Sequence, residues 1–339
     1  MTEPVKTAST PEPGTPELGR LMLVHAHPDD ESSQSGATMA RYAKAGHPVT
    51  LVTCTLGEEG EIIVDELSHL RSAEEDVLGE HRLQELTVAM AELGVTDFVR
   101  LGGDHRYRDS GMSYDEETQR VIPDPSATDD CFWRADLLEA ATHLVELIRD
   151  RRPHVVITYN EFGGYGHPDH VQAHRVAMYG SQLAAAPAFR PDLGEPWQVS
   201  RVLWGAWAES TMREGIRMAR EAGDAEFFEG IDPDGDLPPM VTPDRFIAAI
   251  VDARAHGADK VAALRAHASQ VDVETGFFAN LSAVDGWSME AYVLGAGVPF
   301  DTDGPADDVF AGLGVATTPV PQSVPAPEPN PDPAHPVTA

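Results

Sequence analysis

The sequence predicts an α/β fold: a mostly parallel sheet with helices on both faces and a smaller α+β portion at the C-terminal end. Short apolar runs alternate with stretches of helical spacing, as at 21–24, 32–46 and 49–53, which together indicate a β-α-β unit. Polar, glycine-bearing loops follow four of the apolar runs. Because ligands of open α/β sheets bind outside the carboxyl ends of the strands, we expect these loops to form one active site.

The first of these loops reads His-Pro-Asp-Asp-Glu at 27–31, directly after the apolar run 21–24. His27 and Asp30 offer an imidazole and a carboxylate three positions apart, and Asp29 lies between them. Asp is also a preferred helix N-cap. Taken alone, the segment therefore fits either a turn that caps a helix or a pair of metal ligands.

A second loop repeats this arrangement. The apolar run 154–158 leads into a glycine-rich loop that ends in His167, Asp169 and His170. Two histidines and a carboxylate, with a fourth position left open for water, are a ligand set of catalytic zinc. The residues that fit this set are His27, Asp30 and His170. The residues that remain as acid/base candidates are Asp29 and His167.

The other elements of this half follow from local spacing. Small and apolar residues at helical spacing after Ser32 end at Gly46, a suitable helix C-cap. The expected elements, in order, are a helix at 32–46, a strand at 49–53, a helical region at 66–93, a strand at 97–101, an irregular stretch at 113–132, a helix at 134–150 and a strand at 154–158. Arg82 either faces the site or forms a surface ion pair.

Beyond the second loop the pattern is weaker. The expected elements are a helix to about 185, a strand at 201–207, an acidic loop or lid at 219–240, a helix at 246–267 and a strand at 288–294. His256 and His267 have no partners at ligand spacing, so we expect ordinary surface or packing histidines. The proline-rich ends, 1–19 and 316–339, predict disordered tails around one folded domain at 20–315.

Composition narrows the function classes. The 339 residues carry 24 Lys+Arg and 56 Asp+Glu, a formal net charge of −32. Such a surface repels phosphate backbones and anionic membranes, which argues against nucleic-acid and lipid partners. It favours a small substrate that is neutral or cationic at its reacting end, unless the charge only solvates the surface.

Cysteine usage and hydropathy indicate a cytoplasmic protein. Cys54 and Cys131 have no partner at metal-ligand spacing, and Cys54 closes an apolar run, where we expect it to be buried. No apolar run approaches the length of a membrane span. The sequence leaves the oligomeric state open.

With both motifs considered together, His-Pro-Asp-Asp-Glu at 27–31 and Gly-His-Pro-Asp-His at 166–170, the chain resembles the LmbE-like (PIG-L) family of zinc-dependent N-acetylglucosaminyl de-N-acetylases. The resemblance extends from about residue 21 to the end of the folded region. It implies a Rossmann-like fold and a hydrolase of linear amides. It also implies one zinc ion per subunit, with iron(II) as the alternative occupant.

The resemblance also implies roles for individual residues. Asp29 would be the general base, His167 the general acid or oxyanion stabiliser, and Asp169 the residue that orients His167. Tyr165 would lie near the substrate carbonyl. The residues at the positions of the family's sugar pocket are Glu61, Arg82, Asp109 and Met112.

Within the family, the segments 53–61 and 108–112 are most similar to the deacetylases of mycothiol biosynthesis. This similarity implies hydrolysis of the acetamide of N-acetylglucosaminyl-inositol to glucosaminyl-inositol and acetate. The alternatives are a mycothiol S-conjugate amidase, another N-acyl amino-sugar deacetylase, and a non-catalytic sugar- or metal-binding protein. An acidic residue kept free beside an open metal site argues against the last of these, since binding needs no base.

Overall fold

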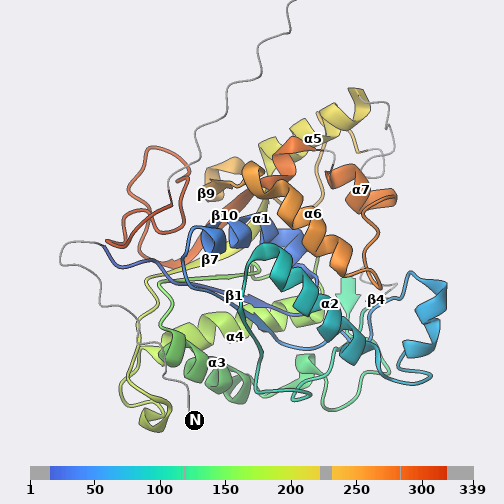
Figure 1. The fold of residues 1–339 in the computed structure, drawn as a ribbon, viewed down its shortest axis with the longest axis horizontal. Helices are drawn as coiled ribbons and strands as arrows, with labels where there is room; N and C mark the ends of the chain where they lie inside the picture. The colour runs from blue at the N-terminus through green and yellow to red at the C-terminus, as the bar shows by residue number, and fades with distance from the viewer. Residues whose placement is uncertain (1–15, 116, 118–119, 222–230, 283, 319–339) are drawn as a thin grey trace, which may run out of the picture.

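A computed structural model describes residues 16–115, 117, 120–221, 231–282 and 284–318. In these residues eight strands form one sheet, which is parallel from β3 to β7 and antiparallel from β7 to β9 (Figure 1). In spatial order the strands are β3 (Asp97–Arg100), β2 (Val49–Thr53), β1 (Leu21–His25), β6 (Val155–Thr158), β7 (Arg201–Ala208), β10 (Met289–Gly297) and β9 (Ile247–Asp252), and β8 (Val241–Thr242) pairs with β7. The predicted α/β fold is confirmed, and the C-terminal portion extends the same sheet.

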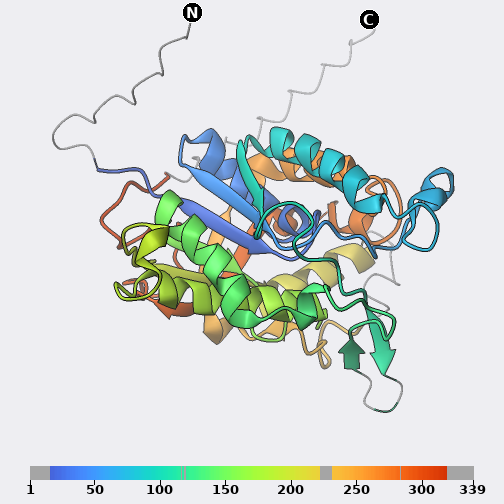
Figure 2. The same cartoon turned by 90° about the horizontal axis from the view of Figure 1, so that it is seen from below.

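Helices cover both faces of the sheet, as Figure 2 shows. One face carries α3 (Leu137–Arg151) and α4 (Pro168–Ala184), and the other carries α1 (Asp30–Lys44), α2 (Leu78–Leu93) and α6 (Gly257–Ala266). The helices α5 (Glu209–Glu221) and α7 (Gly276–Ser282) share a small apolar cluster. A separate hairpin pairs β4 (Ser113–Asp115) with β5 (Arg120–Ile122). The 3₁₀ turns are η1 (Asp65–Leu70), η2 (Phe132–Arg134), η3 (Pro191–Leu193), η4 (Asp244–Phe246), η5 (Arg254–His256) and η6 (Asp285–Ser288).

The central strand β1 is buried on both faces, which explains its unbroken apolar sequence. Leu21 and Leu23 pack into the cluster under α1 and α2, whereas Met22 and Val24 pack into the cluster under α3 and α4. The sheet thus separates two cores, and β1 contributes to each.

Leu23→Ala is expected to lower the free energy of unfolding by about 2–5 kcal/mol, because Leu23 is fully buried and its loss leaves a cavity. Urea denaturation would measure the change. The matched control is Val88→Ala on α2, where Val88 is 53% exposed and the expected change is within about 0.5 kcal/mol. Equal losses in the two variants would contradict the central position of β1.

The strand order places a crevice beside β1. The chain moves outward from β1 through β2 to β3 and then returns to β6 on the other side of β1. The loops after β1 and β6 therefore diverge from neighbouring strand ends, the point at which open α/β sheets bind ligands. These are the loops that carry the two His/Asp motifs.

Two long predicted helices are wrong in part. The region 66–93 begins with the 3₁₀ turn η1, followed by turns in which Asp76 adopts the left-handed conformation. The helix α2 starts only at Leu78. The region 246–267 contains the end of η4, then β9 and η5, and α6 starts only at Gly257. The run Ile-Ala-Ala-Ile-Val at 247–251 fits either structure, and pairing with β10 decides for the strand. The stretch 113–132, expected to be irregular, contains the β4–β5 hairpin.

The ends of the chain and the acidic loop lie partly outside the described residues. Leu18 and Ala316 lie just outside the predicted domain boundaries at 20 and 315, and they form a parallel bridge. The boundaries themselves stay predictions. Within the loop predicted at 219–240, residues 219–221 belong to α5, 222–230 lie outside the described part, and 231–240 form neither helix nor strand. The described residues include no helix with the length and apolar character that a membrane span needs.

Candidate active site

The turn from β1 into α1 holds Asp29 in an uncommon backbone conformation. Its φ is 102° and its ψ is −31°, values that a residue with a side chain rarely adopts and that cost about 1–3 kcal/mol. The Asp29 N–H donates to Glu31 Oε2 at 3.0 Å. Such strain concentrates at functional sites, because the surrounding contacts must enforce it.

The three predicted zinc ligands lie together in the crevice. His27 Nδ1 is 3.2 Å from Asp30 Oδ2, and His170 Nε2 is 3.3 Å from Asp30 Oδ1. All three residues are buried. Asp30 Oδ2 also accepts hydrogen bonds from the His27 N–H at 3.0 Å and from the Tyr159 hydroxyl at 2.7 Å. The carboxylate is thus fixed between the two loops.

The donor atoms suit a divalent metal ion. One nitrogen from each of His27, His167 and His170 lies within 4.8 Å of the others, and the same spacing relates His27, Asp109 and Asp169. His170 Nε2 is buried and has no hydrogen bond in the described residues, although buried nitrogens are normally paired. A metal ion would satisfy it. Which of these residues bind the ion stays a prediction.

The loop after β6 sets the orientation of His170. His170 Nδ1 lies 3.2 Å from the Gly163 carbonyl, a contact that directs Nε2 toward Asp30. Gly163 has φ 69°, and an added Cβ would lie 2.8 Å from Val171 N. Only glycine therefore fits this close approach of the loop to α4.

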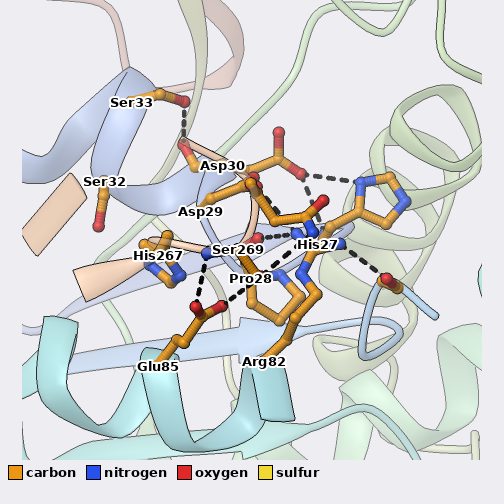
Figure 3. Close-up of polar contacts among 12 residues, drawn as sticks. His27, Pro28, Asp29, Asp30, Ser32, Ser33, Arg82, Glu85, His267 and Ser269 are labelled. Carbon is orange, nitrogen blue, oxygen red and sulfur yellow. Dashed lines mark hydrogen bonds and ion pairs between the residues drawn. The ribbon is translucent and has the colours of Figure 1, made fainter. Parts of the chain in front are cut away.

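Arg82 holds the side chain of Asp29 from below (Figure 3). Its Nη2 donates to Asp29 Oδ2 at 2.8 Å and to the Pro28 carbonyl, and its Nη1 donates to the Gly57 carbonyl at 2.7 Å. Arg82 is only 3% exposed, so of the two interpretations left open the surface ion pair is wrong. At Gly57, with φ 66°, a Cβ would lie 2.0 Å from Arg82 Nη1, so the position requires glycine.

Burial makes the Asp29 carboxyl a weaker acid than an exposed aspartic acid. It raises the pKa of the carboxyl to about 6, against the Arg82 charge, which lowers it. General bases work best when their pKa lies near the operating pH. Asp29 also lines a large cavity, so a carboxylate with a raised pKa is accessible from that cavity.

His167 caps the N-terminus of α4, and its Nδ1 accepts a hydrogen bond from the Asp169 N–H at 3.1 Å. Burial, together with the nearby His27 and His170, lowers the pKa of His167 to about 2. Because Nδ1 accepts a hydrogen bond, the proton of the neutral ring lies on Nε2. A ring in this form can donate from Nε2 to an oxyanion, and the choice between oxyanion stabiliser and general acid stays a prediction.

Asp169 orients His167 through the backbone and not through its carboxylate. The carboxylate lies 3.3 Å from His27 Nε2 and accepts hydrogen bonds from the Ser110 N–H, at 2.9 Å, and from the Ser110 hydroxyl. Asp109 lies on the same side, with Oδ1 3.5 Å from His27 Nε2. Both carboxylates therefore act on His27.

A cavity of about 1040 Å³ opens beside Asp29 and Asp30. Of the remaining predicted residues, Glu61 and Tyr165 line it, whereas Met112 is exposed on the surface. The cavity is also lined by apolar side chains, which include Trp207, Phe277, Phe278 and Trp287. The assignment of Glu61, Arg82, Asp109 and Met112 to substrate binding stays a prediction.

The chain is similar to a known protein family and to several named proteins. The family model PIG-L, described as GlcNAc-PI de-N-acetylase, matches residues 22–179, a span that contains both loops. A 1D-myo-inositol 2-acetamido-2-deoxy-alpha-D-glucopyranoside deacetylase of Nocardioides sp. is 55% identical over 298 residues, which cover 87% of this chain and 98% of that protein. The chain belongs to the PIG-L family.

Other relatives of this PIG-L chain carry the same description. The deacetylase of that name from Kribbella flavida is 54% identical over 299 residues, covering 87% of this chain and 98% of that protein. Among solved structures, the N,N'-diacetylchitobiose deacetylase of Pyrococcus horikoshii is 18% identical, with a TM-score of 0.48 over 75% of this chain and 71% of that one. A likeness this distant supports no conclusion about activity.

Sequence reasoning missed three polar residues of this PIG-L site. Tyr159 directly follows β6, so its place at a strand end was a usable signal. Glu58 Oε2 accepts the Asp109 N–H at 3.0 Å. His267, expected to be an ordinary histidine, is completely buried with Nε2 3.0 Å from Glu31 Oε1. No local pattern could reveal a contact across 236 positions.

Proposed function

We propose that this protein hydrolyses the acetamide of N-acetylglucosaminyl-inositol to glucosaminyl-inositol and acetate, a step of mycothiol biosynthesis. The observation that carries the proposal is Asp29, a carboxylate with a raised pKa that lines a large cavity beside a buried cluster of His and Asp donors. The relatives named as deacetylases of this substrate, at 54% and 55% identity over nearly their whole length, support the substrate assignment.

Zinc is the proposed ion, with His27, Asp30 and His170 as ligands and iron(II) as the alternative occupant. The buried Nε2 of His170, which has no hydrogen bond in the described residues, and the two contacts of Asp30 to the histidines support this set. Such an ion, when bound, would polarise the acetamide carbonyl and lower the pKa of water toward about 7.

The chain's own residues would then move the protons. Arg82 occupies Asp29 Oδ2, which leaves Oδ1 to accept the proton of the attacking water. The neutral His167 would donate from Nε2 to the carbonyl oxygen as negative charge develops there. Asp29 would finally pass its proton to the departing amine. General-base help of this kind is worth about 100- to 10,000-fold in rate.

His167→Ala is expected to lower kcat by about 100- to 1,000-fold, the typical cost of losing one oxyanion donor, while KM changes only a few-fold. Steady-state kinetics of the zinc-loaded variant would measure both constants. Metal analysis should still find one ion per chain. An unchanged kcat would remove His167 from the chemistry, and loss of the ion would make it a ligand.

The substrate assignment is tested by amine release from N-acetylglucosaminyl-inositol and, in parallel, from a mycothiol S-conjugate. Faster turnover of the first is expected. Preference for the second would identify the protein as an amidase of the conjugate instead. Release from neither would overturn the proposal. The predicted cytoplasmic location and the absence of nucleic-acid partners stay predictions.

A further inference from the structure

A completely buried contact between a histidine and a glutamate joins two segments that are far apart in the sequence. Glu31 lies in the first turn of α1, and His267 follows the last residue of α6. Their side chains are 0% exposed, and His267 Nε2 lies 3.0 Å from Glu31 Oε1. Burial alone would lower the pKa of His267, but the neighbouring Glu31 carboxylate raises it. Burying two ionisable side chains costs free energy and need not stabilise the fold, so we expect the pair to have another role.

The two carboxylate oxygens of Glu31 have different hydrogen-bond partners. Oε2 accepts the backbone N–H of Asp29 at 3.0 Å, the residue whose φ is 102°. Oε1 accepts hydrogen bonds from the Ser32 hydroxyl at 2.6 Å and from His267 at 3.0 Å. His267 therefore fixes the rotamer of the side chain that holds the strained backbone of Asp29. Neither Glu31 nor His267 lines the cavity.

The same turn also supports the side chain of Asp29, through α2. Ser269, two residues after His267, donates from its N–H and its hydroxyl to the two oxygens of Glu85, each at 2.7 Å (Figure 3). Glu85 lies one helical turn after Arg82, which binds Asp29 Oδ2. The turn at 267–269 thus contacts both Glu31, which binds the backbone of Asp29, and α2, the helix that carries Arg82.

We propose that His267 and Glu31 are positioning residues for Asp29, which they hold in the strained backbone conformation that aims its carboxylate at the attacking water. The proposal rests on the role of Asp29 as the general base. Neither residue touches the substrate, and both act only through Asp29. A misplacement of about 1 Å at a catalytic group costs about 100-fold in rate.

The first test replaces His267 by two residues. His267→Leu removes the donor at similar volume, and kcat is expected to fall about 100-fold with KM within about threefold and one zinc ion per chain retained. His267→Gln places an amide N–H near the position of Nε2, and kcat is expected to recover to within about fivefold of the native value. An unchanged kcat in His267→Leu, or a loss of zinc parallel to the loss of kcat, would overturn the proposal.

A control histidine separates positioning from general destabilisation. His47 is also buried, with its Nδ1 2.9 Å from the Gly19 carbonyl, and it lies before β2 at the opposite end of the strands. His47→Leu should lower Tm and leave the kcat of the folded enzyme unchanged. If His47→Leu lowered kcat as much as His267→Leu, the effect would be structural and the proposal wrong.

A double variant tests whether the pair acts through Asp29. In an Asp29→Ala background, His267→Leu should change kcat by less than about twofold, because the group it positions is gone. A further large loss there would overturn the proposal. If Asp29→Ala alone kept native turnover, the proposed base would be wrong; if it lost turnover while His267→Leu did not, only the positioning role would fail.

If His267→Leu does not fold, Glu31→Leu with His267→Leu removes both charges and leaves no unpaired charge in the core. That variant is expected to bind zinc and to show the same loss of kcat. Native kcat in the folded double variant would overturn the proposal.

Discussion

Asp29→Ala is expected to lower kcat by about 100- to 10,000-fold while the protein still binds one metal ion per chain, because a general base is lost and no ligand is removed. In the first motif, Arg82 binds Asp29 at Oδ2. Asp30 lies instead between His27 and His170. Two adjacent carboxylates thus have separate partners. Rate assays and metal analysis on the same preparation would measure the two effects.

The control for this variant is Asp30→Ala, in which metal content and activity should fall together. Asp29→Asn adds a closer comparison, since the amide keeps the shape of the side chain and a hydrogen-bond acceptor for Arg82 but cannot take up a proton. If Asp29→Ala lost its metal as completely as Asp30→Ala, Asp29 would be a ligand, and the mechanism proposed above would need another base.

His170→Ala should lose both the metal ion and more than about 1,000-fold of the activity, because a metal-assisted hydrolysis depends on the ion for carbonyl polarisation and water activation. The buried Nε2 of His170 has no hydrogen bond in the described residues and lies 3.3 Å from Asp30 Oδ1, an arrangement that suits two ligands of one metal ion. Atomic absorption after dialysis, compared with the native protein, would measure the loss.

A histidine one turn further along α4 provides the matched control. His174 is buried on the same helix, with its Nδ1 2.9 Å from the Tyr159 carbonyl, and it belongs to neither donor group. His174→Ala should keep the ion. Retention of a full equivalent of metal in His170→Ala would contradict the ligand assignment and would favour the second donor group, His27 with Asp109 and Asp169.

Much of this site could be predicted from local sequence patterns. An apolar run with polar residues at its end is recognisable without partners, and both motifs stand directly after such runs, β1 and β6. Parallel strands place their carboxyl ends at one edge, so the convergence of His27, Asp30 and His170 followed from the strand pattern alone. The burial of Cys54, confirmed by the structure, has the same origin.

Local patterns failed where two structures fit the same residues. The run at 247–251 fits a helix as well as a strand, and its pairing with β10 made it β9. Arg82 fitted a surface ion pair as well as a site residue, and the approach of the loop at Gly57 buried it behind Asp29.

The sequence by itself determined which polar residues stand at the strand ends, and so which residues are predicted to carry the chemistry, because strand and helix periodicity and short motifs are properties of neighbouring residues. Only the tertiary structure decided how those residues are held. The support of Asp29 by Glu31 and His267 joins the start of α1 to the end of α6. Contacts of this kind depend on the order in which strands and helices pack, and that order is fixed by the burial of the whole chain and not by any local pattern.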